Sequence, residues 1–192
     1  MIYALGLGYL LGSIPFGLVL TRLTGKGDIR QIGSGSIGAT NVLRTGSKGL
    51  AALTVLLDAG KGALAVWLAH RFLPGFEAHA AAGALVGHLY PVWLRFKGGK
   101  GVATLIGILI ALLPIGALVF AIVWIAVFLL VRFSSVAGMA AAVSAPISAV
   151  VLGEQARFPL LFGFAVLVVW KHQANIRRLL AGTEPRVGRA KA

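Results

Sequence analysis

The chain has 192 residues, of which 58 % are apolar and 12 % are charged, whereas soluble domains carry about 25 % charged residues. Together with a mean hydropathy of +0.92, this composition excludes a disordered chain, a coiled coil and an ordinary soluble enzyme. The sequence has 18 basic and 5 acidic residues, a formal charge of +13, and no cysteine. The lack of cysteine excludes disulfides, thiolate zinc sites and iron–sulfur clusters. We therefore predict an all-α, polytopic integral membrane protein.

The first apolar block, residues 1–21, contains no charge, and the first basic residue is Arg22. A cleavable signal peptide carries its basic residues before the apolar stretch, so this order predicts an uncleaved first span with the N-terminus outside. The glycines and the proline between Gly12 and Gly17 predict a bend in this helix.

Four further apolar blocks follow, and they comprise residues 49–70, 78–94, 102–131 and 134–170. A span needs roughly 20 residues, so the first three blocks, 1–21, 49–70 and 78–94, predict one helix each. A polar stretch at 153–157 divides the last block, and Pro114 interrupts the helical pattern of the block 102–131. That block forms either one long tilted helix or two short ones.

The distribution of basic residues decides between these alternatives. Basic residues gather in the segments 22–48, 95–100 and 171–192. By the positive-inside rule all three are cytoplasmic, which requires the block 102–131 to cross twice. We therefore predict seven transmembrane helices, some short or broken, with the C-terminus in the cytoplasm. Residues 1–184 form a single membrane domain, and 185–192 form a basic disordered tail able to touch anionic lipid.

The first polar segment, residues 33–44, is rich in glycine. Its glycines allow close backbone approach, its N–H groups can surround an anion, and the Arg44 guanidinium can bind phosphate through two hydrogen bonds. A flexible connector is the alternative, and the segment has no Walker A pattern. The candidate residues are Gly33, Gly35 and Gly38, the hydroxyl and amide residues Ser34, Ser36, Thr40 and Asn41, and Arg44.

The second polar segment leads directly into an apolar helix. Free N–H groups at a helix N-terminus, preceded by glycines and lysines, suit a phosphate group. A basic anchor with a glycine turn is the alternative reading. The candidates are Lys97, Gly98, Gly99, Lys100, Gly101 and Thr104.

The third polar segment follows the last apolar block. His172 and Asn175 are three residues apart and share one side of a helix, and Glu184 is the single acid of this segment. Within the second predicted span, Asp58 and Lys61 are also three apart, and we interpret them as a structural ion pair that faces the helix bundle. No metal-ligand pattern is present, so we predict no metal.

These segments resemble one family in order and spacing. Gly33-Ser34-Gly35 to Arg44, Lys97 to Thr104, and His172 with Asn175 and Arg178 are similar to the three motifs of the bacterial acyl-phosphate:glycerol-3-phosphate acyltransferases, the PlsY family. The resemblance implies a multi-span enzyme of the bacterial inner membrane with its active site on the cytoplasmic side. It implies transfer of a fatty acyl group from acyl phosphate to the sn-1 hydroxyl of glycerol 3-phosphate, the first acylation of phospholipid biosynthesis, which yields lysophosphatidic acid and inorganic phosphate.

The resemblance also implies roles for individual residues. Ser34, Arg44 and Lys100 would hold phosphates, helped by the N–H groups of 33–38 and 98–101, and Glu184 would brace the loops. Asn41, His172 and Asn175 would orient glycerol 3-phosphate or the acyl carbonyl. The base is either His172 or a substrate phosphate, and we favour the phosphate because no carboxylate is evident beside His172. The pair H-x-x-x-x-D, typical of acyl-CoA-dependent enzymes, is absent, since the residues five after each histidine are Gly75, Ala84, Trp93 and Arg177.

The implied functional partner is the soluble enzyme that forms acyl phosphate (PlsX), and the chain would act in membrane lipid as a monomer without a cofactor. A nucleic-acid partner is not expected, because the basic residues lack interleaved aromatic residues. The alternative function is a small transporter of a phosphorylated solute, but such proteins usually show internal repeats and polar residues at mid-membrane, and we find no convincing repeat.

Overall fold

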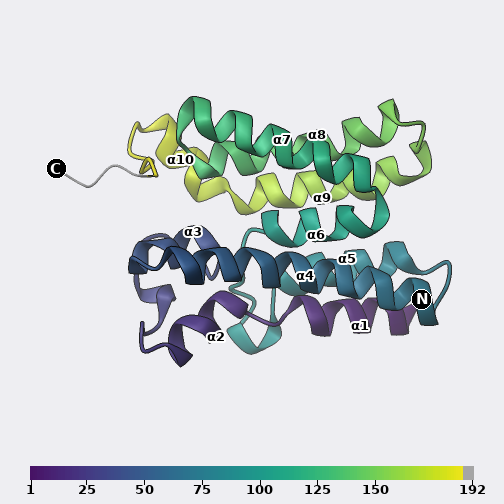
Figure 1. Cartoon of the computed structure of the whole chain (residues 1–192), viewed down its shortest axis with the longest axis horizontal. Helices are drawn as coiled ribbons and strands as arrows, with labels where there is room; N and C mark the ends of the chain where they lie inside the picture. The colour runs from purple at the N-terminus through teal and green to yellow at the C-terminus, as the bar shows by residue number, and fades with distance from the viewer. Residues whose placement is uncertain (188–192) are drawn as a thin grey trace. The chain divides into compact units, whose positions relative to one another are not determined.

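The computed structural model describes residues 1–187, and over this range the chain is all-helical (Figure 1). Four short 3-10 turns connect the α-helices: η1 (Ile29–Gln31), η2 (Leu43–Thr45), η3 (Val92–Leu94) and η4 (Gln155–Arg157). The α-helices are α1 (Ile2–Gly12), α2 (Phe16–Leu23), α3 (Ala39–Val42), α4 (Lys48–Phe72), α5 (Glu77–Leu89), α6 (Val102–Leu112), α7 (Pro114–Val131), α8 (Ser134–Val151), α9 (Phe158–Lys171) and α10 (Gln173–Leu180).

The breaks expected in the apolar blocks are present. The first block, expected as one bent helix, divides at the predicted bend into α1 and α2 around Pro15. The block 102–131 divides where α6 ends and Pro114 begins α7. The block 78–94 differs from the expectation of one helix, because α5 ends at Leu89 and Pro91 precedes the separate turn η3. Proline cannot continue the helix, since it lacks the N–H donor.

Within residues 1–187, four helical segments are long and apolar enough to cross a membrane: Ile2–Leu23, Lys48–Phe72, Pro114–Val131 and Ser134–Val151. The helix Val102–Leu112 is apolar but shorter, and α5 and α9 have 13 and 14 residues. The all-helical membrane class is therefore confirmed. The count of seven spans and their orientation stay predictions.

The chain forms two compact units, Met1–Leu112 (unit 1) and Leu113–Ala192 (unit 2). The single domain over 1–184 stays a prediction. Of the predicted tail, residues 188–192 lie outside the described residues. Before them, the Arg186 guanidinium lies 5.2 Å from the centre of the Phe133 ring, and the Val187 N–H donates to the Arg132 carbonyl at 3.0 Å.

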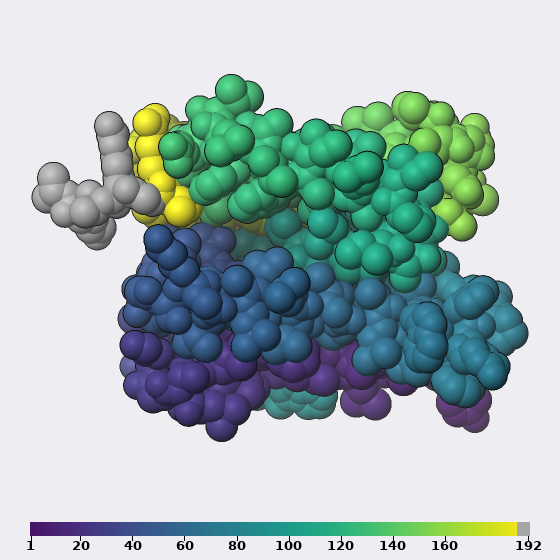
Figure 2. Space-filling view, in the orientation of Figure 1, coloured from purple at the N-terminus to yellow at the C-terminus, as the bar shows by residue number. Residues whose placement is uncertain are grey.

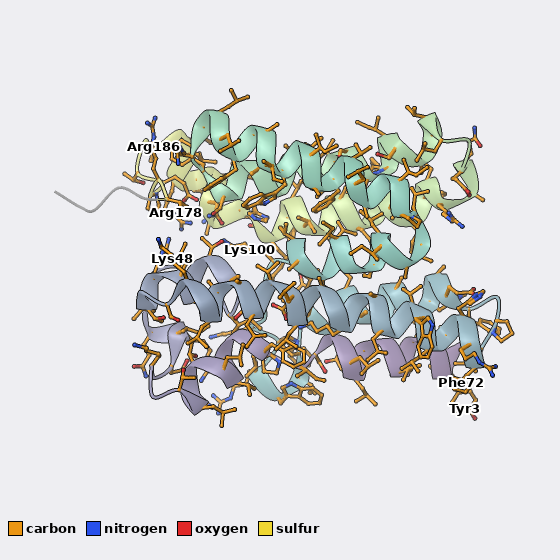
Figure 3. All side chains as sticks on the ribbon, viewed as in Figure 1. Tyr3, Lys48, Phe72, Lys100, Arg178 and Arg186 are labelled. Carbon is orange, nitrogen blue, oxygen red and sulfur yellow. The ribbon has the colours of Figure 1, made fainter. Side chains whose placement is uncertain are left out.

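In unit 1, α1 packs against α5 and α4 packs against α6. A Cβ on Gly8 or Gly12 would overlap the carbonyl oxygens of α5, and one on Gly83 or Gly87 would overlap those of α1. The two helices therefore approach through reciprocal pairs of glycines four residues apart, the close packing that small residues allow in membranes. Tyr3 and Phe72 lie at one end of this unit, whereas Lys48 and Lys100 lie toward the other (Figure 3).

In unit 2, α8 packs against both α7 and α9. Its buried residues are mainly alanines at four-residue intervals, Ala137, Ala141, Ala145 and Ala149. Small side chains at this spacing form one face that admits neighbouring helices closely.

The surfaces of α4 and α7 are strongly apolar. Both helices are visible in the space-filling view, α4 in blue and α7 in green (Figure 2). Their exposed side chains include Leu56, Leu64 and Trp67 on α4, and Ile115, Leu118, Ile122, Ile125 and Leu129 on α7. Surfaces of this kind suit contact with lipid acyl chains rather than with water.

Candidate active site

The first polar loop is organised by Asn41, a buried residue of α3. Its Oδ1 accepts from the backbone N–H of Ser34 at 3.3 Å and from the guanidinium of Arg44 at 3.2 Å. Its Nδ2 lies within hydrogen-bond distance of three carbonyl oxygens, those of Ile29, Ile32 and Ser36, at 2.6, 3.2 and 2.8 Å. All of these hydrogen bonds join the Asn41 amide group to residues of its own loop or just before it. Asn41 therefore stabilises the conformation of the loop.

Gly33 and Arg44 lie against each other. Gly33 has a φ of +56°, and a Cβ at this position would overlap the Arg44 guanidinium and Asn41 Oδ1. Only glycine therefore lets Arg44 lie over the loop. Ser34, Gly35, Thr40 and Arg44 are exposed, so a ligand can reach them.

Fewer backbone N–H groups of this loop are available to an anion than its glycines suggest. The N–H of Ser34 donates to Asn41, that of Gly35 to the Ile32 carbonyl at 3.1 Å, and that of Gly38 to Ser36 Oγ at 3.4 Å. Side-chain groups, above all the exposed Arg44 guanidinium, are consequently more accessible to an anion than these N–H groups.

An ion-pair cluster lies immediately before this loop. Asp28 caps η1 by accepting from the Arg30 N–H, and it pairs with the guanidinium groups of Arg22 and Arg30. The hydrogen bond from the Arg30 side chain, with those from the Arg30 backbone and Arg22, holds the pKa of Asp28 well below its usual range. The Asp28 carboxylate is therefore ionised, and it is paired with the two arginines.

The second polar loop is attached to the end of α5. The N–H of Gly98 donates to the Leu89 carbonyl at 3.2 Å, and the N–H of Gly99 donates to the His88 carbonyl at 3.0 Å. A Cβ at Gly98 or Gly99 would overlap His88, at its carbonyl and its ring respectively. These two amides are engaged in holding the loop, whereas Lys97 is exposed, Lys100 is half-buried, and Gly101 is buried with a φ of +89° before α6.

Thr104 does not lie on the surface of this loop. It is fully buried on α6. A Cβ on Gly62 of α4 would lie 2.5 Å from the Thr104 carbonyl oxygen and 3.2 Å from its methyl group. Its hydroxyl has no hydrogen-bond partner among the described residues. This placement assigns Thr104 to the packing of α4 and α6, and its phosphate contact stays a prediction.

In unit 2, His172 lies where α9 ends and α10 begins, and it is buried. Its Nδ1 lies 2.7 Å from the carbonyl oxygen of Val168, so Nδ1 carries the proton and donates it. In the neutral form of the ring, this tautomer has its lone pair on Nε2. A backbone carbonyl therefore orients His172, the task for which no carboxylate was evident in the sequence.

Glu184 accepts three hydrogen bonds close to Asn175. Its Oε1 accepts from Asn175 Nδ2 at 2.6 Å and from Ser135 Oγ at 2.7 Å, and its Oε2 accepts from Arg178 Nε at 2.7 Å. Burial opposes ionisation of Glu184, but these hydrogen bonds and the charge of Arg178 outweigh it and lower the pKa. Because Nδ2 faces the carboxylate, Asn175 Oδ1 is left as a buried acceptor without a hydrogen bond among the described residues.

Asp58 and Lys61 form the ion pair expected from their spacing, with Lys61 Nζ 2.6 Å from Asp58 Oδ1. His88 and the Ile14 carbonyl accompany this pair, and Ser135 accompanies Glu184; none of these three partners was predicted from the sequence. A histidine at the end of an apolar helix and a serine at the start of another were the signals available for His88 and Ser135.

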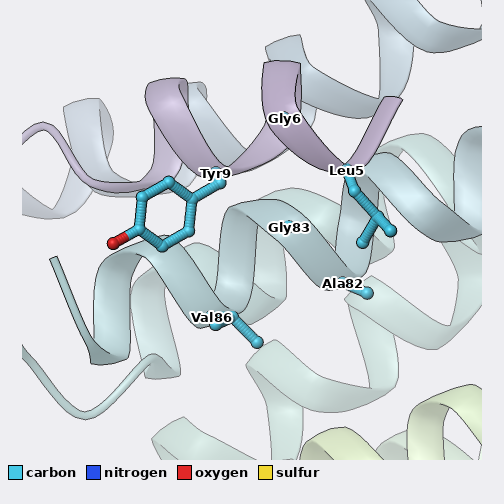
Figure 4. Close-up of a pocket in the computed structure, with 6 residues that line it drawn as sticks. All are labelled: Leu5, Gly6, Tyr9, Ala82, Gly83 and Val86. Carbon is cyan, nitrogen blue, oxygen red and sulfur yellow. The ribbon is translucent and has the colours of Figure 1, made fainter. Parts of the chain in front are cut away.

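Apolar grooves are present in both units. A groove of about 300 Å³ between α1 and α5 is lined by Leu5, Gly6, Tyr9, Ala82, Gly83 and Val86 (Figure 4). The Tyr9 hydroxyl donates to the Tyr90 carbonyl at 2.9 Å, so this groove offers no reactive group. A second groove of about 390 Å³ in unit 2 follows α8 and α9 from Val143 and Phe162 to Gln173 and Ile176 of α10. No cluster of three or more metal-ligating side chains exists within residues 1–187.

These features define an integral membrane protein whose polar loops bear groups suited to an anionic substrate. A family model described as Glycerol-3-phosphate acyltransferase matches residues 2–182. The chain is 57 % identical over 188 residues to the glycerol-3-phosphate acyltransferase of Mesorhizobium japonicum, covering 98 % of this chain and 96 % of that one. The corresponding protein of Erythrobacter litoralis is 56 % identical over 182 residues, with 95 % and 92 % covered.

Solved structures agree with the sequence comparisons. The crystal structure of PlsY (YgiH), an integral membrane glycerol 3-phosphate acyltransferase, in its glycerol 3-phosphate form superposes with a TM-score of 0.92. It is 37 % identical, and the match covers 97 % of this chain and 95 % of that one. Its lysophosphatidic acid form gives a TM-score of 0.89 at the same identity. The chain belongs to the glycerol-3-phosphate acyltransferase family.

Proposed function

We propose that the protein transfers a fatty acyl group from acyl phosphate to the sn-1 hydroxyl of glycerol 3-phosphate. The observation that carries this proposal is the family match over residues 2–182, together with the 37 % identical crystal structure of PlsY (YgiH) in its glycerol 3-phosphate form. The acyl-phosphate donor is favoured because none of the four histidines has the aspartate five residues later that acyl-CoA-dependent enzymes use.

The reaction is balanced without any further reactant. The sn-1 hydroxyl oxygen attacks the acyl carbonyl carbon, a C–O ester bond forms, and the bond between that carbon and the phosphate oxygen breaks. The phosphate leaves with the electron pair, and the hydroxyl proton ends on it. The products are lysophosphatidic acid and inorganic phosphate. Since the donor already has a good leaving group, the protein must mainly position two anions and stabilise developing charge.

Unit 1 supplies the groups that would hold phosphates. Arg44 is exposed above the first loop, and the Asn41 amide limits its movement through the hydrogen bond of 3.2 Å. A guanidinium fork held in this way suits a phosphate better than a mobile one. Ser34 on the same loop and Lys100 on the second add a hydroxyl and a charge.

Unit 2 supplies groups suited to a hydroxyl. Asn175 Oδ1, fixed by the bond of Nδ2 to Glu184, can accept a hydrogen bond from the glycerol backbone. An acyl chain would find apolar surface in the groove along α8 and α9, which reaches α10 at Gln173, the residue after His172. We assign the reaction to the cytoplasmic side of the bacterial inner membrane, with the enzyme acting as a monomer supplied by a soluble acyl-phosphate-forming enzyme.

Replacement of His172 tests which group takes the hydroxyl proton. Because a substrate phosphate is adjacent to the reacting oxygen, we expect His172→Ala to keep more than about a tenth of the normal kcat, whereas a general base contributes about 10²–10⁴-fold. The measurement is steady-state kinetics at saturating concentrations of both substrates. A fall of a hundredfold or more in folded protein would instead assign the proton transfer to His172 Nε2.

The proposed function is tested by lysophosphatidic acid formation with the purified protein. Glycerol 3-phosphate is supplied with palmitoyl phosphate in one reaction and palmitoyl-CoA in a parallel one. We expect turnover with palmitoyl phosphate alone. Turnover with palmitoyl-CoA would overturn the assigned donor. Absence of turnover with both, in folded and monodisperse protein, would favour a transporter of a phosphorylated solute.

A further inference from the structure

The proposed reaction does not use the most deeply buried charges of unit 1. The Asp58 and Lys61 side chains are only 3 % and 2 % exposed, and their charged atoms are 2.6 Å apart. His88 Nδ1 lies 3.7 Å from the same Asp58 oxygen. Burial of ionisable groups at membrane depth costs free energy. A cluster of three such groups therefore indicates a structural or functional role.

Lys61 connects this cluster to the break between α1 and α2. Its Nζ donates to the Ile14 carbonyl at 2.7 Å. The adjacent Ser13 carbonyl accepts from the Trp93 indole N–H at 2.8 Å. Two donors from separate elements therefore fix the two residues before Pro15, which determine the direction in which α2 leaves α1.

α2 in turn supports the first polar loop. A Cβ on Gly17 of α2 would overlap the Ile37 carbonyl of that loop and lie 3.2 Å from the Val42 side chain. Because this contact is so close, a shift of α2 would also shift the first polar loop. The ammonium group of Lys61 is thus linked through the Ile14 carbonyl and α2 to the loop that carries Arg44.

His88 connects the same cluster to the second polar loop. Its backbone carbonyl accepts from the Gly99 N–H at 3.0 Å, and its imidazole ring lies where a Cβ on Gly99 would be. The imidazole near Asp58 is therefore packed directly beneath the residue before Lys100.

We propose that Asp58, Lys61 and His88 form a positioning cluster that fixes the positions of both phosphate-binding loops of unit 1. The cluster acts on the first loop through the Ile14 carbonyl and on the second through Gly99. This inference rests on the proposed function, because the loops are assigned to substrate phosphates. The three residues act through Arg44, Lys100 and the loop backbones.

The test replaces the pair as a whole, because removal of one partner would leave a buried charge uncompensated. Replacement of a buried ion pair by apolar residues of similar volume is often neutral for stability, so Asp58→Leu/Lys61→Met separates positioning from folding. The matched control is His70→Ala/Glu77→Ala, which removes a histidine–carboxylate contact of the same unit with a separation of 3.0 Å and an exposed histidine. Tm, KM for both substrates and kcat are measured with palmitoyl phosphate as the donor.

We expect the Asp58/Lys61 variant to keep a Tm close to that of the wild type and the KM for at least one substrate to rise about tenfold or more. Loss of binding that is equal in the ground and transition states raises KM, whereas a purely structural defect lowers the amount of active enzyme and leaves KM unchanged. Wild-type KM values in this variant, or failure of it to fold, would overturn the inference. An inactive wild type would instead refute the proposed function.

The contact between His88 and Gly99 allows an independent test by a double-mutant cycle. Gly99→Ala should raise KM because the added methyl group meets the imidazole ring. In His88→Ala/Gly99→Ala the ring is gone, so the second substitution should add less than about a twofold further change. Additive effects of the two substitutions would show that His88 does not position the loop through Gly99, and would contradict this part of the inference.

Discussion

Two buried asparagines illustrate how the same side chain takes different roles. Asn41 directs its amide group to the backbone of its own loop and to Arg44. Asn175 donates to Glu184 and keeps a buried oxygen without a hydrogen bond among the described residues. Because a buried unpaired acceptor is unfavourable, Asn175 is the one that a substrate hydroxyl would satisfy. Asn41 is better described as a positioning residue.

The assignment of Arg44 to phosphate binding is testable by Arg44→Lys. Lysine keeps the charge but loses the planar fork and the fixed geometry that Asn41 imposes. We expect KM for at least one substrate to rise about tenfold, which corresponds to about 1.4 kcal/mol, with an unchanged Tm. The control is Arg22→Lys, since Arg22 is exposed and paired with Asp28. Near-normal KM values for both substrates would remove Arg44 from the phosphate site.

The hydrogen bonds of Glu184 predict a pH-dependent contribution to stability. Its pKa is lower in the folded protein than in the unfolded chain, so the contribution is present above the unfolded pKa and is lost as the pH falls through the folded pKa. We expect Glu184→Gln to destabilise the protein by about 1–3 kcal/mol at neutral pH. The difference in Tm from the wild type should shrink as the pH is lowered below the usual glutamate pKa. A difference that is constant between neutral and acidic pH would contradict the role of the ionised carboxylate.

At the scale of elements, packing in unit 1 depends on glycines rather than on large side chains. Gly8 of α1 meets the Ala80 carbonyl of α5 so closely that a methyl group cannot be accommodated, whereas Gly6 of the same helix has nothing within 4 Å. Without a hydrophobic driving force between helices in lipid, such close approach is what holds them together.

This contrast gives a matched pair of substitutions. Gly8→Ala should destabilise the protein by about 1–3 kcal/mol, because the helices must separate to make room. Gly6→Ala should leave stability unchanged or raise it slightly, since alanine favours the helix more than glycine does. Thermal unfolding of both variants in the same detergent measures the effect. Equal Tm values for the two variants would refute the close packing of α1 and α5.

Element boundaries followed from the sequence where a proline or a glycine cluster provides a local reason. Pro114 marks the start of α7 and Pro15 the break before α2. The end of α5 at Leu89 was not predicted, because the residues up to Leu94 remain apolar around Pro91. Within an apolar stretch, the sequence thus predicts the end of a helix only where the proline that ends it is taken into account.

At the scale of the whole molecule, the orientation of the helices can be measured directly because the chain has no cysteine. Single cysteines at exposed positions Ala78 and Ala156 should react with a membrane-impermeant maleimide in intact cells. Cysteines at exposed positions Thr24 and Ala181 should react only after permeabilisation. Labelling of Ala181→Cys in intact cells would exclude a cytoplasmic C-terminus and with it the seven-span arrangement.

The sequence by itself determined the membrane class, the helical breaks at the first and fourth apolar blocks, and the three polar segments. These properties depend on composition and on residues within a few positions of one another, which a sequence displays directly. It also paired Asp58 with Lys61, because residues three apart on a helix lie on one face.

Only the tertiary structure decided which partners these groups have. It placed His88 beside Asp58, joined Lys61 to the Ile14 carbonyl 47 residues away, and brought Ser135 to Glu184 across 49 residues. It also buried Thr104 between helices and engaged the amides of Gly98 and Gly99. Such contacts depend on how distant helices pack, and packing through small residues leaves no periodic signal that identifies the partner.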